Sequence, residues 1–212
     1  MKQLLTGHSA PTAKTSILWF RFLLNAIRRS GLDSQDIATS VGFDITLLEN
    51  PDAYVQDEFT ALLLMAAVEK SANDTYGLKA GQYFVPSAFG PLGYAMMTSS
   101  NLRSALERTT YLTASVTDTT RTRMSFSGNS CLFEVQMPSY FPEVARVVDE
   151  FLMASILTAF RWLVGFDFIP LSIEFMHEQP VEVEPYLKAF GRMPVFSSQR
   201  CAFVFSNEQL EL

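Results

Sequence analysis

The chain has 212 residues, of which 48% are hydrophobic and 18% are charged. This balance excludes an intrinsically disordered chain and predicts a globule with a large core, to which 18 phenylalanines contribute. The net charge of −6 excludes a protein that holds DNA by its own surface, because such a surface repels phosphate. Two cysteines are too few for a disulfide framework or a cysteine-rich metal site.

Signals for a membrane or for export are lacking. No apolar run reaches the roughly 18 uncharged residues that a membrane helix needs. The apolar run 17–24 is interrupted by Arg21 and followed by Arg28 and Arg29, which does not fit a signal peptide. We therefore expect a cytoplasmic protein without a membrane partner. Residues 1–15 show no periodicity and are expected to form a flexible tail.

Helix start and stop signals follow one another through the first half of the chain. Ser16 is a suitable cap for a helix that Gly31 ends, and Asp33 or Ser34 can cap the next one. The predicted helical segments are 16–30, 35–41, 44–48, 55–71 and 75–83. The apolar stripe of segment 16–30 could form a dimer interface or pack internally, and the sequence leaves both possibilities open.

A glycine and proline elbow at 89–93 leads into a short apolar segment, 94–97, and then into a helix that begins at Leu102. Ser100 or Asn101 can cap this helix by accepting a hydrogen bond from its first turn. We interpret the elbow glycines as residues that permit a sharp turn and a close approach between helices.

The second half of the chain is predicted to hold a sheet and one long helix. Strand segments 121–126 and 131–137 are joined by a hairpin signal, and Pro138 ends the second. Segment 143–164 is apolar around most of its circumference, which indicates a helix buried across a sheet. The remaining predicted elements are strand 171–176, helix 181–190 and strands 195–196 and 201–205.

This element order predicts an α+β fold, in which a helical N-terminal layer packs on a small mixed or antiparallel sheet with a long buried helix. We see no internal repeat and no linker of low complexity, so we expect a single domain over residues 16–212.

Catalytic and metal-binding signatures are weak. The two histidines are His8, in the expected tail, and His177, just beyond a predicted strand. No G-x-S-x-G nucleophile motif is present, and His177 beside Glu178 is poor evidence for a metal or haem site. A structural hydrogen bond, a ligand contact and a catalytic or metal role remain open for His177. We expect a protein that is not an enzyme and holds no metal or cofactor.

Two groups of motifs resemble a known family. The first group is Tyr76-Gly77-Leu78, Gly81, Phe89-Gly90-x-Leu92-Gly93-Tyr94 and Ser99-Ser100-x-Leu102-x-x-Ala105-Leu106. The second is Pro170-x-x-Ile173-x-Phe175-x-His177-x-x-Pro180, Tyr186, Phe190-Gly191-x-x-Pro194-Val195-Phe196 and Phe203-x-Phe205. In order and spacing they resemble the effector-binding domain of AraC-type transcription regulators, in the arabinose-binding-like subfamily that is not a cupin. The resemblance covers roughly residues 21–212.

The resemblance implies a domain that binds a small organic effector and self-associates, as a homodimer. It also implies that DNA is bound by a helix-turn-helix module that follows the sensor. The sequence stops at 207–212, about where the linker to that module would begin. We therefore expect this sequence to contain the sensor domain but not the DNA-binding module.

An effector pocket would be mostly apolar with a few polar groups that fix orientation. Our candidate ligand-binding residues are polar or aromatic side chains on otherwise apolar elements: Phe89, Tyr94, Tyr111, Phe133, Glu150, Arg161 and His177, with Arg123 and Glu134 as further polar candidates. Arg161 could clamp a carboxylate, which suggests an amino acid or a carboxylic acid as the effector. Alternatively, Arg161 could pair with Asp149 or Glu150, or lie on a solvated face.

Two other functions remain open from the sequence. The domain could be a constitutive dimerisation module whose pocket is filled by its own Phe and Met side chains. It could also be a small hydrolase, although only His177 offers a base for that chemistry.

Overall fold

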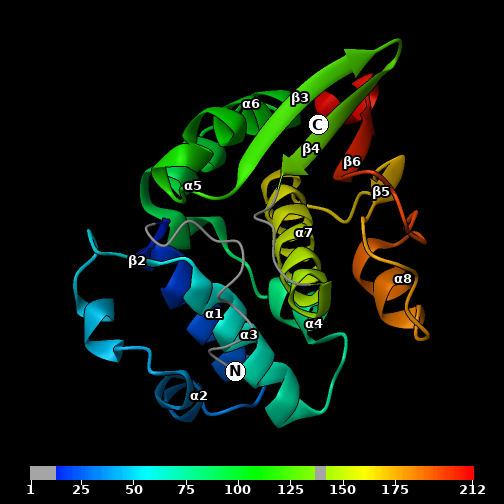
Figure 1. The fold of residues 1–212 in the computed structure, drawn as a ribbon. Coiled ribbons are helices and arrows are strands. Elements are labelled where there is room, and N and C mark those ends of the chain that lie inside the picture. Colours follow the sequence, from blue (N-terminus) through cyan, green and yellow to red (C-terminus); the bar gives the residue numbers. More distant parts are fainter. Residues whose placement is uncertain (1–12, 137–141) are drawn as a thin grey trace.

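The computed structural model describes residues 13–136 and 142–212, and it has the α+β fold that the sequence predicts (Figure 1). The helices of the first half are α1 (Ile17–Arg29), α2 (Ser34–Val41), α3 (Glu58–Ser71), α4 (Tyr76–Gly81), α5 (Gly90–Met97) and α6 (Leu102–Leu112), with 3-10 turns η2 (Ile45–Glu49), η3 (Pro86–Phe89) and η4 (Thr113–Ser115) between them. The second half holds α7 (Pro142–Val164), α8 (Glu184–Phe190) and α9 (Asn207–Leu210). The long helix α7 lies between the helical layer and the main sheet.

The predicted helix caps are confirmed because they depend on local hydrogen bonds. The Ser16 hydroxyl accepts from the Leu18 N–H, and the Asp33 carboxylate accepts from the Gln35 and Asp36 N–H groups. Gly42 ends α2 with φ of 75°, a left-handed conformation that suits glycine. Asn101 caps α6. Seven residues of α1 are buried, so the apolar stripe of that helix packs internally.

The predicted helix 55–71 begins later than expected, because Tyr54–Gln56 forms a strand, β2. This strand pairs in antiparallel fashion with β1 (Lys14–Ser16), so Lys14 and Thr15 belong to a sheet and not to a tail. The first twelve residues of that expected tail, with His8, lie outside the described residues. The pairing joins residues about 40 positions apart, which local sequence signals do not reveal.

The main sheet has the strand order β3-β4-β6-β5, and its strands pair in antiparallel fashion. The strands are β3 (Arg121–Ser127), β4 (Ser130–Gln136), β5 (Ser172–Glu174) and β6 (Cys201–Ser206). The hairpin between β3 and β4 is confirmed, whereas the position of Pro138 lies outside the described residues. The predicted strand 195–196 is reduced to an isolated parallel bridge between Val195 and Glu174.

Helix α8 begins at Glu184, three residues later than predicted, and Pro185 lies in its first turn. Proline is tolerated there because the first N–H groups of a helix have no intrahelical acceptor, so Pro185 does not interrupt the helix. Across the described residues, no helix is both long and apolar enough to cross a membrane.

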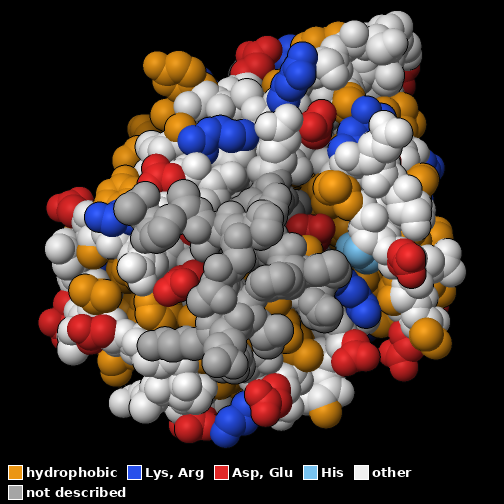
Figure 2. Space-filling view, in the orientation of Figure 1, with side chains coloured by type: hydrophobic (Ala, Val, Ile, Leu, Met, Phe, Trp, Pro, Cys, Tyr) orange, Lys and Arg blue, Asp and Glu red, His pale blue; other side chains and the backbone are white. Residues whose placement is uncertain are grey.

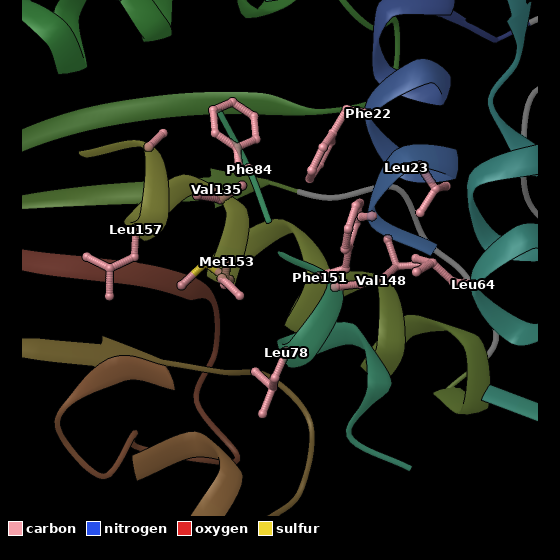
Figure 3. Close-up of a cluster of buried hydrophobic side chains, with 14 of the residues drawn as sticks. Phe22, Leu23, Leu64, Leu78, Phe84, Val135, Val148, Phe151, Met153 and Leu157 are labelled. Atoms are coloured by element: carbon pink, nitrogen blue, oxygen red, sulfur yellow. The ribbon is translucent and has the colours of Figure 1, made fainter. Parts of the chain in front are cut away.

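The core is built around α7, as its apolar circumference predicts. Figure 3 shows Phe22 of α1 and Leu64 of α3 beside Phe151 and Val148 of α7, while Leu157 points to the side of the sheet. Aromatic packing adds to this core: the rings of Phe22 and Phe151 are stacked with centroids 5.2 Å apart. The helical layer and the sheet therefore share one core.

Glycines allow the closest helix contacts. A Cβ atom on Gly81 of α4 would lie 2.6 Å from the Phe151 carbonyl oxygen and 2.7 Å from the Ala154 Cβ, both on α7. Gly77, one turn earlier, faces the Val147 carbonyl oxygen in the same way. In the elbow, a Cβ on Gly93 would overlap the Pro86 carbonyl oxygen, so the predicted close approach is confirmed there as well.

Candidate functional site

A cavity lies where β1, α1, the start of α3, η3, α5, α6, the start of β3 and α7 meet. It has about 100 Å³ of space for the centres of water-sized molecules. A water molecule needs about 10–15 Å³ by this measure, so the cavity can accommodate a small organic molecule. One part of its wall is aromatic and aliphatic, and another part is rich in threonine.

The apolar part of the wall is made by Trp19, Phe84, Phe89, Leu92 and Met96, together with α7 residues Val148, Leu152, Ile156, Ala159 and Phe160. Its aromatic rings hold one another in place. The rings of Phe84 and Phe89 are stacked with centroids 4.8 Å apart, and Trp19 meets Phe89 edge to face at 5.9 Å. The Trp19 indole N–H donates to the Thr60 hydroxyl at 3.0 Å, which fixes the ring.

The threonine part of the wall consists of eight residues, Thr15, Thr60, Thr109, Thr113, Thr117, Thr119, Thr120 and Thr122. Several of their hydroxyls are used inside the protein. Thr109 donates to the Ala105 carbonyl at 2.8 Å, and Thr113 donates to the Thr109 carbonyl at 2.6 Å. The hydroxyls of these two residues are thus satisfied within the fold, and their side chains add mainly apolar surface.

A polar group of four side chains lies in the same wall. The Thr15 hydroxyl donates to the Asp57 carboxylate at 2.6 Å and lies 2.8 Å from the Thr117 hydroxyl. Asp57 is buried and stands at the N-terminus of α3, where the helix dipole stabilises negative charge. The Thr122 hydroxyl is buried and has no hydrogen-bond partner among the described residues. Buried hydroxyls are normally paired, so Thr122 marks a position where a bound molecule could supply the partner.

Of the seven predicted ligand-binding residues, only Phe89 lines this cavity. Tyr94 and Tyr111 project into solvent, with exposed fractions of 69% and 84%. Phe133 is fully buried in the core, edge to face with Phe160 at 5.7 Å. Arg123 and Glu134, the further candidates, face each other across β3 and β4 and do not line the cavity.

Arg161 has a structural environment away from the cavity. Its guanidinium donates to the carbonyls of Phe168, Ala189 and Phe190 at 3.1, 2.8 and 2.9 Å. The expected partners Asp149 and Glu150 are not used, and the nearest carboxylate, Asp167, is 3.9 Å away and largely exposed. Arg161 thus joins the end of α7 to the last turn of α8.

We expect Arg161→Met to lower the free energy of unfolding by about 2–4 kcal/mol, because it leaves three carbonyl oxygens without their donor. Urea unfolding measures the change. The matched control is Arg200→Met, which removes a half-exposed ion pair to Glu174 and should cost less than about 1 kcal/mol. Equal losses for the two variants would contradict the structural role of Arg161.

Glu150 and His177 lie on either side of Tyr186, in a second cluster that includes α7 and α8. The Glu150 carboxylate accepts from Arg146 at 2.8 Å and from the Tyr186 hydroxyl, and its other oxygen has no partner among the described residues. Burial raises the pKa of Glu150 to about 7, although the bonds from Tyr186 and Arg146 lower it in part. Burial also raises the pKa of the neighbouring Asp149 to about 7.

The His177 ring packs among Phe175, Tyr186 and Phe196, with centroids 4.9–6.0 Å away. Its Nδ1 lies 2.9 Å from the Glu178 carbonyl oxygen, which is the structural hydrogen bond that the sequence left open. Burial lowers the pKa of His177, so the neutral ring is favoured. This cluster is distinct from the cavity, since none of its members lines it.

The residues that sequence reasoning missed are Trp19, Asp57 and the threonines. One signal could have pointed to most of the threonines: seven of them fall within residues 109–122. Within the described part of the chain, no group of three or more His, Cys, Asp or Glu residues is placed to hold a metal ion. Figure 2 shows basic side chains scattered among acidic ones on the displayed face, which does not form a phosphate-binding patch there.

Comparisons with known proteins agree with these observations. The family model described as the arabinose-binding domain of AraC transcription regulators, N-terminal, matches residues 31–212. No curated protein was found to match the chain. Among solved structures, the crystal structure of the transcriptional regulator CdpR from Pseudomonas aeruginosa is similar, with a TM-score of 0.66 at 14% identity. The likeness covers 92% of this chain and 56% of the CdpR chain, so this chain spans about half the length of that regulator.

Proposed function

Because the chain belongs to the family of arabinose-binding N-terminal domains of AraC transcription regulators, we propose that it binds a small organic effector in the cavity and thereby regulates a DNA-binding module. The observation that carries this proposal is the cavity itself, with its apolar wall and small polar group. Such a combination is typical of small-molecule sites, in which apolar surface supplies affinity and a few polar groups fix orientation.

The position of the cavity supports a regulatory role. Its wall includes β1 and α1 of the helical layer, the start of β3 in the main sheet, and α7, which packs against both. An effector there contacts both halves of the domain at once. If these halves can adopt two arrangements, an effector that binds one arrangement more tightly shifts the population of the domain toward that arrangement.

The open cavity also favours an effector-binding domain over a constitutive dimerisation module. That alternative requires the pocket to be filled by Phe and Met side chains of the domain itself. Phe84, Phe89 and Met96 line the cavity, but the described side chains leave it open. We further propose that the domain self-associates, that a helix-turn-helix module in the same regulator contacts DNA, and that the regulator acts in the cytoplasm.

A thermal-shift screen against small metabolites tests effector binding. A compound present at 100 times its dissociation constant should stabilise the domain by about 2.7 kcal/mol and raise its melting temperature. Ala159→Leu fills the cavity from α7 and should abolish that rise. The matched control is Ala145→Leu on the same helix, outside the cavity wall, which should keep it.

Two outcomes contradict the proposal. One is that no compound in a broad library raises the melting temperature of the unaltered domain. The other is that a stabilising compound acts equally on Ala159→Leu, which would place its binding elsewhere. Sedimentation velocity on the same samples tests self-association, and a monomer at every concentration would contradict that part.

A further inference from the structure

We infer that Thr122 anchors the effector, and that the effector is a small uncharged molecule with one hydrogen-bonding group on a hydrocarbon body. This inference rests on the proposed function, because it describes the ligand of the same cavity. It departs from the expected clamp by Arg161, whose guanidinium lies away from the cavity and donates to three backbone carbonyls. The hydrogen bonds within the wall, its residue types and the size of the cavity carry the inference.

Most hydroxyls of the wall are already bonded within the domain. Those of Thr109, Thr113 and Ser155 each donate to the backbone carbonyl four residues earlier, at 2.6–2.8 Å. The Thr60 hydroxyl accepts from the Trp19 indole N–H at 3.0 Å. Because the fold uses these groups, they present mainly apolar surface to a ligand.

The polar side chains beside β1 are engaged as well. The Thr15 hydroxyl bonds to Asp57 at 2.6 Å and lies 2.8 Å from the Thr117 hydroxyl, which in turn lies 2.9 Å from the Thr119 hydroxyl. Asp57 has a further interaction besides its bond to Thr15. We therefore assign the anchoring of the ligand to none of these four residues.

Thr122 differs from the other threonines of the wall. Among the described lining residues, it holds the one buried side-chain oxygen that lacks a hydrogen-bond partner. Leaving a buried hydroxyl unpaired is unfavourable, so a ligand that supplies the partner gains this free energy on binding. Thr122 stands on β3 opposite Val135 of β4, and the strand pairing fixes its position. It can therefore orient a ligand.

A single hydroxyl suits an uncharged polar group. A carboxylate has about four lone-pair positions and an ammonium has three N–H donors, so one hydroxyl leaves most of either group unpaired once its water shell is lost. None of the described lining residues is a lysine, an arginine or a histidine, which could have neutralised an anion. An alcohol or a carbonyl group can pair with one hydroxyl at a much smaller desolvation cost.

The cavity also limits the body of the ligand. It has about 100 Å³ of space, and an engineered cavity of about 150 Å³ with a Leu, Ile and Phe lining binds benzene. A body of roughly six carbon atoms is therefore the expected size. Phe84, Phe89, Leu92, Leu152 and Ile156 have no hydrogen-bonding side-chain atoms, so a second polar group would remain unpaired against them.

The test uses three probes with the same six-carbon chain: 1-hexanol, 1,6-hexanediol and hexanoate. Binding to the whole domain is measured by calorimetry and by melting temperature. We expect 1-hexanol to bind at least about tenfold more tightly than hexanoate and about threefold more tightly than the diol, because the extra polar groups lose water without gaining partners. Ala159→Leu, which fills the cavity, should abolish binding of 1-hexanol.

Thr122→Val tests the anchor, because it is nearly isosteric and removes only the unpaired hydroxyl. It should weaken 1-hexanol at least about threefold, and it should raise the melting temperature of the domain without ligand, since an unpaired buried group is removed. The matched control is Thr109→Val in the same wall, whose hydroxyl donates to the Ala105 carbonyl. This control should keep the affinity for 1-hexanol. Melting curves without ligand verify that both variants fold.

The outcomes separate the inference from the proposed function. If hexanoate or the diol binds as tightly as 1-hexanol, the inferred ligand class is wrong while the cavity remains a binding site. If Thr122→Val weakens 1-hexanol no more than Thr109→Val does, Thr122 is not the anchor. If none of the probes binds but another compound binds in the cavity, the inferred class is likewise overturned. If no compound binds at all, the proposed function fails together with the inference.

Discussion

Gly81→Ala should destabilise the domain by about 3 kcal/mol or more. The added Cβ would lie 2.6 Å from the Phe151 carbonyl oxygen and 2.9 Å from the Ser155 nitrogen. Both are backbone atoms of α7, which is packed on several sides and cannot yield as a flexible side chain could. Overpacking a rigid contact costs about 1–3 kcal/mol and more where backbones must separate, which outweighs the roughly 1 kcal/mol that alanine gains over glycine in a helix.

The matched control is Gly128→Ala in the hairpin between β3 and β4. A Cβ there meets nothing within 4 Å, although the φ of +55° is strained for alanine. We expect this variant to cost about 1–2 kcal/mol from backbone strain alone. Urea unfolding compares the two. If Gly81→Ala costs no more than Gly128→Ala, the contact between α4 and α7 is looser than the structure shows.

The stability of the domain should fall by several kcal/mol as the pH rises from about 4 to 7. Burial raises the pKa of Asp149 from 3.8 to about 7 and that of Glu150 from 4.5 to about 7. Between those values the folded state holds protons that the unfolded chain has released, so raising the pH favours unfolding. One pKa unit corresponds to about 1.4 kcal/mol, so each of the two carboxyls accounts for roughly 3–5 kcal/mol.

Asp149→Asn tests this dependence. It removes the ionisable group and keeps an oxygen for the Cys201 thiol, which donates to Asp149 at 3.6 Å. The variant should be more stable than the unaltered domain above pH 7, and its loss of stability between pH 5 and 8 should be smaller. The control is Asp52→Asn, which makes the same substitution at an exposed position. An unchanged profile for Asp149→Asn would show that this carboxyl is ionised freely in the folded domain.

The parts of the fold that the sequence predicted are those fixed by local chemistry. Ser16, Asp33 and Asn101 cap helices through hydrogen bonds to residues two or three positions away. The family resemblance is confirmed by the family match over residues 31–212. The strand β2 was missed because its partner, Lys14–Ser16, lies far away in the sequence and both strands are short.

The candidate site was much harder to predict than the fold. Its polar group brings together Thr15, Asp57 and Thr117, which only the tertiary structure places side by side. Arg161 was selected because it is a charged residue on an apolar helix. Its partners are backbone carbonyls. Every residue has such a carbonyl, so the residue types at these positions do not reveal the partners of Arg161. Whether Tyr94, Tyr111 or Glu150 contacts a ligand stays a prediction, although none of them lines the cavity.

The central position of α7 has a consequence for biosynthesis. The slot that receives Gly77 and Gly81 is formed by residues 147–155, so the face of α4 that bears these glycines has no partner until the ribosome has added them. Phe22 of α1 can contact Phe84 and Phe89 earlier, but it also gains its stacking partner Phe151 only at this stage. Since chains grow at about 5–20 residues per second, the nascent N-terminal helices expose their apolar faces for several seconds. During that time a chaperone that covers them should increase the yield of the native domain.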